Sequence, residues 1–348
     1  MKLFREILII CLLGKLIACS PLASGEINDV WGHKQVATIE MAGSDSVWVC
    51  HLSMLKDTVT VPLSYFVEEL EMVKLDNRDA ALVSSSKTII GKQYILVHKM
   101  GHVPFKLFTK SGTYLRDIGS FGQGAGEYGL AYDAQMDEEN NRLYVLCWQA
   151  DHILVFDLQG NILQPIRLAH WSPKGVFHVE TERGRVHVCA LSFNRDFVGD
   201  RHSPMIWTQS LDGKIIKELP AGYLAVNDYR NEIKSLNNGT VMDIGFWFGG
   251  QYRNDSLYHY NNQEFRLLPR FTLDYGGHEL TPHSFGELQN HFWGEISYPV
   301  RLSPHSSTTT PPEYYMVDKH TLRGAFVEIY NDFLGGIPAD WFFSSHDG

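Results

Sequence analysis

The chain has 348 residues, of which 30 are glycine and 12% are aromatic, and its formal net charge at neutral pH is −10. A net acidic chain without a run of basic residues argues against a nucleic-acid partner, because such a partner requires clustered Lys and Arg side chains that displace counterions. The many glycines and aromatic residues favour a protein of short strands joined by turns.

The first eighteen residues predict a secretory signal. Lys2 and Arg5 precede an apolar run, 7–13, that is too short to span a membrane. The run leads into Leu16-Ile17-Ala18-Cys19, which resembles the bacterial lipobox, where cleavage leaves the cysteine at the new N-terminus to carry acyl chains. We therefore expect residues 1–18 to be a lipoprotein signal peptide with Cys19 as the lipidation site. The alternative is an ordinary signal peptide with an incidental cysteine.

The anchor determines where the protein is expected to reside. Residues 19–27 are mostly small and predict a tether, and residues 28–348 predict a single folded domain. Acyl chains on Cys19 would make the membrane a partner. The expected location is the Gram-negative envelope, on the outer membrane, facing either the periplasm or the cell surface.

Five similar units follow in chain order, each with several short apolar segments and tight-turn signals. They cover 80–118, 119–168, 176–219, 232–273 and 285–329. The last turn of each unit lies at Gly112, Gly160, Gly213, Gln263 and Thr321, at intervals of 48, 53, 50 and 58 residues. Units of about fifty residues with this content predict four-stranded propeller blades.

The second unit shows the pattern most clearly. Arg142 to Trp148 alternates apolar and polar residues, the segment ILVFD follows, and Gln159-Gly160-Asn161 is a hairpin turn signal. Ahead of these strands stands Gly122-Gln123-Gly124-Ala125-Gly126-Glu127-Tyr128. This layout resembles NHL-type repeats and, more closely, the bacterial six-bladed β-propeller lipoproteins, in which a GxGPGEY-type motif precedes a blade. Ala125 stands where that family usually has proline. The resemblance implies a fold and little about activity.

The five units and one closing blade predict an all-β fold, a six-bladed β-propeller of four-stranded antiparallel blades. The last blade is expected to be shared: residues 331–348 supply its inner part, and N-terminal strands from residues 28–76 close it. Such closure would remove the exposed sheet edges of an open array. A chain shorter than its relatives at the C-terminus is the alternative.

The search for catalytic motifs is mostly negative. The sequence holds no GxSxG elbow, no Walker A loop and no HExxH helix. Residues 124–129 match GxGxxG, but a strand pattern follows where a dinucleotide site needs a helix. We therefore expect no cofactor. His278, His283 and His291 lie in one loop-like stretch and are weak metal candidates, because irregularly spaced histidines in a propeller loop are more often surface residues or hydrogen-bonded.

A binding site is easier to motivate, because the loops at the mouth of a propeller channel are its usual recognition surface. Glu127 and Tyr128 enter the first strand of their blade and are expected near one mouth. Trp148, Asp151 and His152 are expected in a loop of the same blade. Aromatic faces beside carboxylates suit sugar or peptide ligands. The alternative for each residue is structural: Tyr128 packs between blades, Glu127 caps backbone donors and Trp148 belongs to the core.

Together these features predict an envelope-anchored lipoprotein β-propeller that acts as a binding or scaffold module for a glycan, a peptide or an envelope protein. The alternative is an NHL-like propeller enzyme, a lyase or hydrolase, with its site at the central channel mouth. Histidines and carboxylates gathered around an ion would favour the enzyme. Aromatic and neutral polar groups would favour binding.

Overall fold

The computed structural model describes residues 9–11, 30–83, 87–99, 103–122, 124, 126–235, 242–248, 253–303 and 306–339. Cys19 and nearly all of the predicted signal peptide and tether lie outside the described residues. The exception is β1 (Ile9–Cys11), which pairs with β5 (Glu71–Val73). Within the described ranges, no helix is both long enough and apolar enough to cross a membrane.

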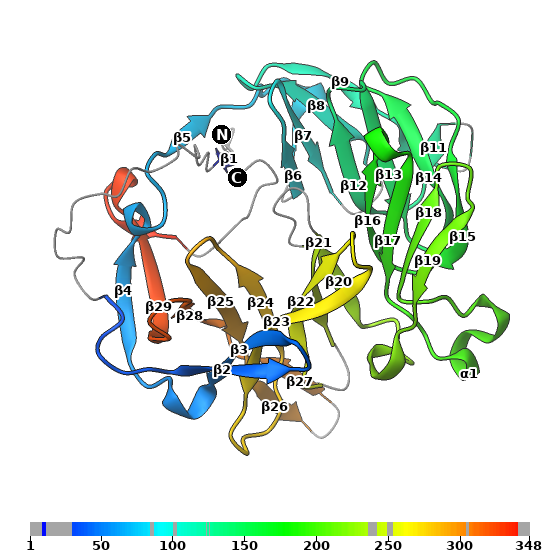
Figure 1. The fold of residues 1–348 in the computed structure, drawn as a ribbon. Coiled ribbons are helices and arrows are strands. Elements are labelled where there is room, and N and C mark those ends of the chain that lie inside the picture. The colour runs from blue at the N-terminus through cyan, green and yellow to red at the C-terminus, as the bar shows by residue number, and fades with distance from the viewer. Residues whose placement is uncertain are drawn as a thin grey trace. The chain divides into compact units, whose positions relative to one another are not determined.

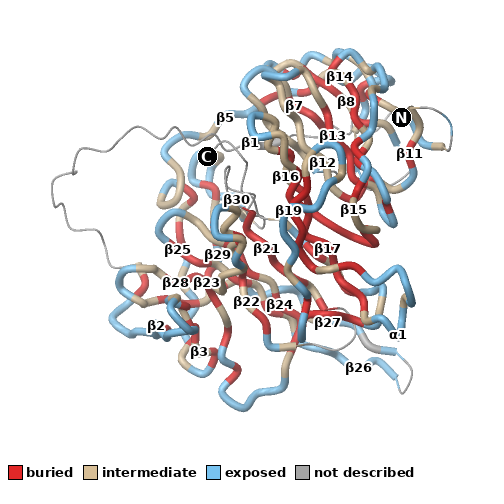
Figure 2. The backbone as a smooth tube through the Cα atoms, turned by 45° about the vertical axis from the view of Figure 1, so that its right-hand side comes forward, coloured by how far each residue is buried: buried red, intermediate tan, exposed pale blue. Residues whose placement is uncertain are grey.

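The described chain forms two compact units. Unit 1 contains Glu71–Tyr229, and unit 2 contains 30–70 and 230–339. In both units buried residues follow the strands, and exposed residues gather at the turns (Figure 2).

Unit 1 holds three four-stranded antiparallel sheets, drawn in cyan to green in Figure 1. The first has β6 (Lys87–Ile90), β7 (Tyr94–His98), β8 (Phe105–Thr109) and β9 (Tyr114–Ile118). The second has β12 (Ala131–Asp137), β13 (Arg142–Cys147), β14 (Ala150–Asp157) and β15 (Ile166–Ser172). The third has β16 (Gly175–Glu180), β17 (Arg185–Ala190), β18 (Ile206–Ser210) and β19 (Ile215–Leu219). In each sheet the strands lie in sequence order, which is the meander of a propeller blade.

Unit 2 holds two larger sheets. One has the order β2 (Ala37–Ala42), β3 (Asp45–His51), β23 (Arg266–Asp274), β22 (Ser256–Asn261), β21 (Met242–Trp247) and β20 (Glu232–Ser235). The other contains β24 (His283–Glu287), β25 (His291–Ile296), β28 (Glu313–Asp318) and β29 (Gly324–Asn331). Both β4 (Thr58–Pro62) and the short β30 (Ile337–Pro338) pair with β29.

The prediction of six blades is wrong: the all-β propeller fold is present, and the described residues form five blades. The N-terminal strands do not close a sixth sheet. Instead β3 pairs in parallel with β23, and β4 pairs in parallel with β29, so each extends a blade that is already complete (Figure 1). The physical reason is that the outer edge of a four-stranded blade offers unpaired backbone groups to any extended segment that reaches it. Residues 332–334 form a 3-10 turn, η7, instead of an inner strand, and 340–348 lie outside the described part.

Polar side chains join two neighbouring sheets of unit 1. Asp133, Gln135 and Asp137 alternate along β12 and therefore point to the same side of the strand. Asp133 accepts from Phe177 N at 3.0 Å, and Gln135 accepts from Val179 N at 2.7 Å. Backbone donors on the edge of β16 are thus satisfied by side chains of β12, which fixes the second blade against the third.

His98 lies in the core of the first blade. It is 5% exposed, its ring stacks on Phe105 with centroids 4.8 Å apart, and its Nδ1 has no hydrogen-bond partner among the described residues. Burial, with a smaller effect of the Lys87 charge, lowers the pKa of His98 to about 3. The histidine is therefore neutral in the folded protein over the physiological range.

We expect His98→Phe to reduce the loss of stability in acid. The folded protein keeps His98 unprotonated while the unfolded chain takes up a proton, so stability falls as the pH drops below the ordinary histidine value. At about pH 5 this one group costs about 2 kcal/mol. Urea unfolding near neutral pH and at about pH 5 measures the difference. Lys87→Met, which removes the smaller cause, should have a weaker effect in the same direction. Equal acid losses in the wild type and His98→Phe would contradict the assignment.

Candidate functional site

Four aromatic residues of unit 1 form a cluster on segments that connect strands. Trp148 lies in the turn between β13 and β14, and Tyr229 lies between β19 and β20. Phe193 and Phe197 lie between β17 and β18, where the chain forms α1 (Arg195–Val198) and η5 (Gly199–Arg201). We call these four residues the aromatic platform.

Tyr229 is the centre of the platform. Its ring centroid lies 4.6 Å from that of Phe193, 5.4 Å from that of Phe197 and 6.2 Å from that of Trp148. Phe193 is only 1% exposed, whereas Trp148 is 39%, Phe197 44% and Tyr229 36% exposed. The rings of Trp148, Phe197 and Tyr229 thus keep a large part of their apolar surface in solvent, while the fourth ring, that of Phe193, is buried.

Hydrogen bonds to the backbone hold the segments of the platform in place. Asn194 N donates to Val226 O at 3.0 Å, and Val226 N donates to Ser192 O at 3.0 Å, so the two segments that carry Phe193 and Tyr229 are tied together. Lys174 is buried, and its Nζ donates to Tyr229 O at 2.6 Å. These bonds fix the platform before any ligand arrives.

The turn that carries Trp148 is also fixed. Trp148 N donates to Leu130 O at 2.8 Å, and Gln149 N donates to Pro173 O at 2.9 Å. Gln149 has φ 55°, a left-handed conformation that non-glycine residues rarely adopt. Such conformations are maintained where the surrounding structure holds them, and they are common at functional sites.

An amide pair lies beside the platform. Asn194, next in sequence to Phe193, donates from Nδ2 to Asn227 Oδ1 at 2.9 Å, and Asn227 shortly precedes Tyr229. Charged residues lie in the same segments, and one of them, Arg201 at the end of η5, lies over the ring of Trp171 at 5.7 Å. The platform therefore offers ring faces and a neutral hydrogen-bonding pair.

Of the predicted ligand residues, the structure brings Trp148 into the platform. Glu127 is half-buried and accepts from Gly124 N at 2.8 Å, and a Cβ on Gly122 would collide with its carboxylate. Tyr128 is buried, and its hydroxyl accepts from Phe105 N and donates to Val103 O, both at 3.1 Å. These contacts match the structural alternatives for Glu127 and Tyr128.

Asp151 and His152 are placed differently from the expectation. They belong to β14 and not to the loop before it, because the turn comprises only Trp148 and Gln149. Both are exposed, and His152 Nδ1 lies 2.6 Å from Asp151 Oδ1. That hydrogen bond is the main reason why the pKa of Asp151 lies below its ordinary value.

The three candidate metal histidines do not come together. His278 is exposed in the turn after β23, while His283 and His291 begin the two strands β24 and β25 and so lie at opposite ends of that hairpin. His291 packs against the rings of Trp31, Tyr65 and Phe66. In the part of the chain that is described, no group of three or more His, Cys, Asp or Glu side chains is arranged to hold a metal ion.

Unit 2 also contains a buried chain of hydrogen-bonded polar groups that the sequence did not predict. His283 Nε2 lies 2.5 Å from Asp255 Oδ1, and His283 Nδ1 lies 2.6 Å from the hydroxyl of Tyr275. Asp255 Oδ2 and the Tyr315 hydroxyl are also buried and have no partner among the described residues. No local motif marks this set, because its members lie on separate strands and turns.

The pKa values of Asp255 and His283 are both raised. Burial raises the pKa of Asp255, and the hydrogen bond from His283 offsets only part of that effect. Burial lowers the pKa of His283, but the hydrogen bond and charge of Asp255 outweigh it, so the pKa of His283 lies above its ordinary value. The pair therefore retains a proton more tightly than two separate side chains would.

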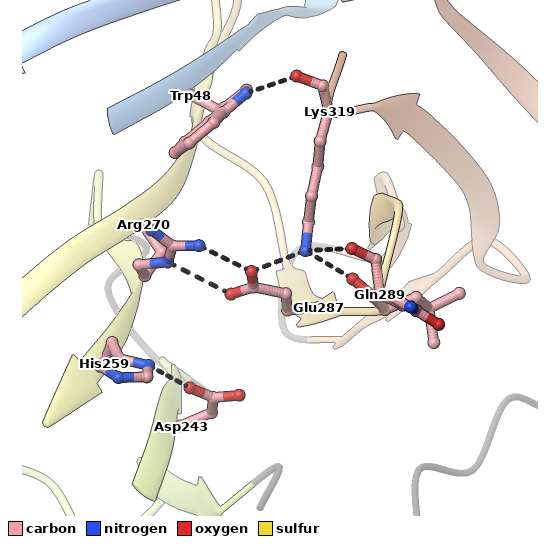
Figure 3. Close-up of polar contacts among 8 residues, drawn as sticks. Trp48, Asp243, His259, Arg270, Glu287, Gln289 and Lys319 are labelled. Atoms are coloured by element: carbon pink, nitrogen blue, oxygen red, sulfur yellow. Dashed lines mark hydrogen bonds and ion pairs between the residues drawn. The ribbon is translucent and has the colours of Figure 1, made fainter. Parts of the chain in front are cut away.

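A second network in unit 2 secures the N-terminal strand β3 (Figure 3). Glu287 Oε1 accepts from Arg270 Nη2 at 2.8 Å and from Lys319 Nζ at 2.7 Å. Trp48, on β3, donates from Nε1 to Lys319 O at 3.2 Å, and the Arg270 guanidinium lies 5.2 Å from its ring centroid. Burial acts to raise the pKa of Glu287, but the two cations outweigh it and hold the value below the ordinary range. This network is a structural clamp.

Comparison with known proteins supports the fold. Residues 47–338 match a protein family described as "Domain of unknown function (DUF4934)". No functionally curated protein matches the sequence.

Two proteins from Bacteroides are among the solved structures that resemble the chain. A candidate exported protein of Bacteroides fragilis has a TM-score of 0.52 and 13% identity, over 78% of this chain and 80% of that one. A member of the DUF4221 family from Bacteroides vulgatus has a TM-score of 0.43 and 10% identity, over 76% of this chain and 82% of that one. At 13% identity the first likeness supports the fold alone.

We expect His283→Leu to lower the free energy of unfolding by about 3 kcal/mol, because Asp255 would remain buried without its partner. The loss should be smaller in acid, where Asp255 is protonated. The double variant Asp255→Leu/His283→Leu should lose less than the single variant, since no buried charge remains. Urea unfolding of the wild type, the two single variants His283→Leu and Asp255→Leu, and the double variant measures this. A double variant as unstable as the sum of both single changes would contradict it.

Proposed function

The chain belongs to the family described as Domain of unknown function (DUF4934). We propose that it is an envelope-anchored binding module that holds its ligand on the aromatic platform of unit 1. The ligand is a glycan, a peptide or an envelope protein. The platform supplies contact surface and orientation.

The proposal rests on one observation. The rings of Trp148 and Phe197 both pack against the ring of Tyr229, yet each of the three residues is more than a third exposed. Packing in a core would have buried these rings, as it buries Phe193 beneath them. Exposed apolar surface gathered in one place marks interaction sites in soluble proteins. Aromatic rings are also the side chains that contribute most to binding energy, because they are large and rigid.

The position of the platform supports the same function. All of its residues come from segments between strands, and the three antiparallel sheets of unit 1 hold those segments. Recognition residues are commonly placed on loops that a rigid scaffold supports. The hydrogen bonds of Lys174 and Asn194 reduce the entropy that a ligand would otherwise lose in ordering the site.

Two features support a location in the envelope. The N-terminal sequence has the layout of a lipoprotein signal, with Cys19 as the acylated residue. A protein with a similar fold is itself a candidate exported protein. Anchoring through Cys19 would keep the binding surface outside the cytoplasm.

Ligand binding should raise the melting temperature of the full chain. We expect a shift of several degrees with one class among neutral polysaccharides, peptidoglycan fragments and peptides rich in tyrosine and proline, because a ligand at about 100 times its Kd stabilises by about 2.7 kcal/mol. Trp148→Ala/Phe197→Ala should abolish the shift. Phe333→Ala, which removes a ring of similar exposure in unit 2, should leave it intact. No shift with any class, or an unchanged shift in the double variant, would contradict the proposal.

Acylation should depend on Cys19. In cells fed an alkyne-tagged fatty acid, the wild type and Cys11→Ala should carry the tag and sediment with membranes. Cys19→Ala should carry no tag and should leave the membrane fraction, because each buried methylene of the acyl chains contributes about 0.8 kcal/mol to anchoring. Tag incorporation that survives Cys19→Ala would refute the lipoprotein assignment.

A further inference from the structure

We infer that the ligand of the platform is a neutral polysaccharide; this inference rests on the proposed binding function and narrows it to one chemical class. Three properties of the site lead to it: the orientation of the exposed rings, the amide pair beside them and the local balance of charge. A fourth, the position of all four rings on connecting segments and not on a strand, argues against a peptide that extends a sheet.

The exposed rings point in different directions. The plane of Trp148 makes an angle of 73° with that of Tyr229, and the plane of Phe197 makes an angle of 53° with it. One flat group cannot stack on all three rings. Successive sugar rings of a polysaccharide present apolar C–H faces at different angles, and the electron-rich face of an aromatic ring attracts such C–H groups. The three rings therefore suit several linked sugars better than one planar ligand.

The amide pair suits hydroxyl groups. The bond from Asn194 Nδ2 to Asn227 Oδ1 leaves the Asn194 side-chain oxygen and the Asn227 side-chain nitrogen for a ligand. Asn227 is exposed and Asn194 is half-buried, so both can be reached from solvent. A sugar hydroxyl both donates and accepts, and an acceptor beside a donor matches neighbouring hydroxyls on one ring. These hydrogen bonds are neutral.

The charge around the platform is close to balanced, although the whole chain carries −10. Segment 191–205 has two arginines and two aspartates. Asp228 and Asp151 add two carboxylates beside Tyr229 and the Trp148 turn, and Lys174, whose Nζ donates to Tyr229 O, adds one cation. An anionic polymer requires an excess of cations at its site, and a basic peptide requires an excess of carboxylates. The platform has no large excess of either, so its charge matches a neutral ligand.

A peptide would need a different surface. Extended peptides commonly bind by adding a strand to an open sheet edge, so that main-chain hydrogen bonds provide the affinity. The platform is built from a turn, the short α1 and η5, and a connecting segment. Phe193 and Val226 already pair with each other in a parallel bridge. The platform residues themselves lie on no strand, so their rings and amides favour sugars over a peptide that extends a sheet.

Calorimetric titration of the full chain tests the inference with four probes: galactomannan and dextran as neutral polysaccharides, polygalacturonate as an anionic one, and a peptide rich in tyrosine and proline. We expect at least one neutral polysaccharide to bind, with an affinity that does not change between low and high salt. Trp148→Ala and Phe197→Ala should each weaken binding about tenfold. Asn227→Ala should weaken it severalfold. Phe333→Ala should bind as the wild type does, and circular dichroism should show that every variant is folded.

Other outcomes separate the two proposals. Binding of the peptide alone, lost in the Trp148 and Phe197 variants, would overturn the polysaccharide inference and leave the binding function of the platform standing. Binding of polygalacturonate alone, with strong salt dependence, would overturn the neutral class in the same way. Binding of a neutral polysaccharide that no platform variant weakens would overturn both. Failure of all four probes would also count against both.

Discussion

The unpaired edge of a β-sheet is the constraint on which this structure depends most. Each blade ends in a strand whose outer backbone groups need a partner or protection. In unit 2 the N-terminal segment supplies partners: β3 covers β23, and β4 covers β29. Trp48, on the covering strand β3, then contacts Lys319 and Arg270, and the Glu287 carboxylate binds both of these cations. Side chains therefore also fix the covering strand. With those edges satisfied, the chain forms five blades and uses its N-terminal strands for reinforcement.

Unit 1 meets the same constraint differently. Its outer strands β9, β15 and β19 remain at sheet edges and carry charged residues, among them Arg116, Asp117, Arg167, Lys217 and Glu218. Charges on an edge strand discourage pairing with another chain. The exposed rings of the platform belong to connecting segments and not to these edge strands. An exposed apolar group there does not interrupt the hydrogen bonds between strands. The scaffold can therefore present Trp148, Phe197 and Tyr229 to solvent without weakening its sheets.

Local features of the structure could be predicted from the sequence. The five repeating units and their hairpin turns were correct, because strand alternation and turn glycines are properties of a few consecutive residues. Gly160, for example, has φ 95°, which a residue with a side chain rarely adopts. The blade number was wrong because it depends on which distant strand the N-terminal segment meets, and Phe271 pairs with Trp48 across more than two hundred residues.

The same distinction applies to the site. Trp148 was identified because it lies beside a turn in a clear unit. Phe193, Phe197 and Tyr229 were missed because only the packing of three connecting segments brings them together. The GQGAGEY motif attracted attention as a ligand site, but Tyr128 packs in the core and Glu127 binds the motif's own backbone. A conspicuous local motif can thus serve the fold, while the exposed cluster arises from residues that are inconspicuous in sequence.

The most direct measurement is hydrogen–deuterium exchange of the full chain, followed peptide by peptide, with and without a saturating amount of each probe that binds in the calorimetric titration. If the platform holds the ligand, exchange slows in segments 191–205 and 220–229 and in the turn at Trp148, and it stays unchanged in the β24–β25 hairpin of unit 2. Slower exchange confined to other segments, or no change anywhere, would contradict a ligand site on the platform.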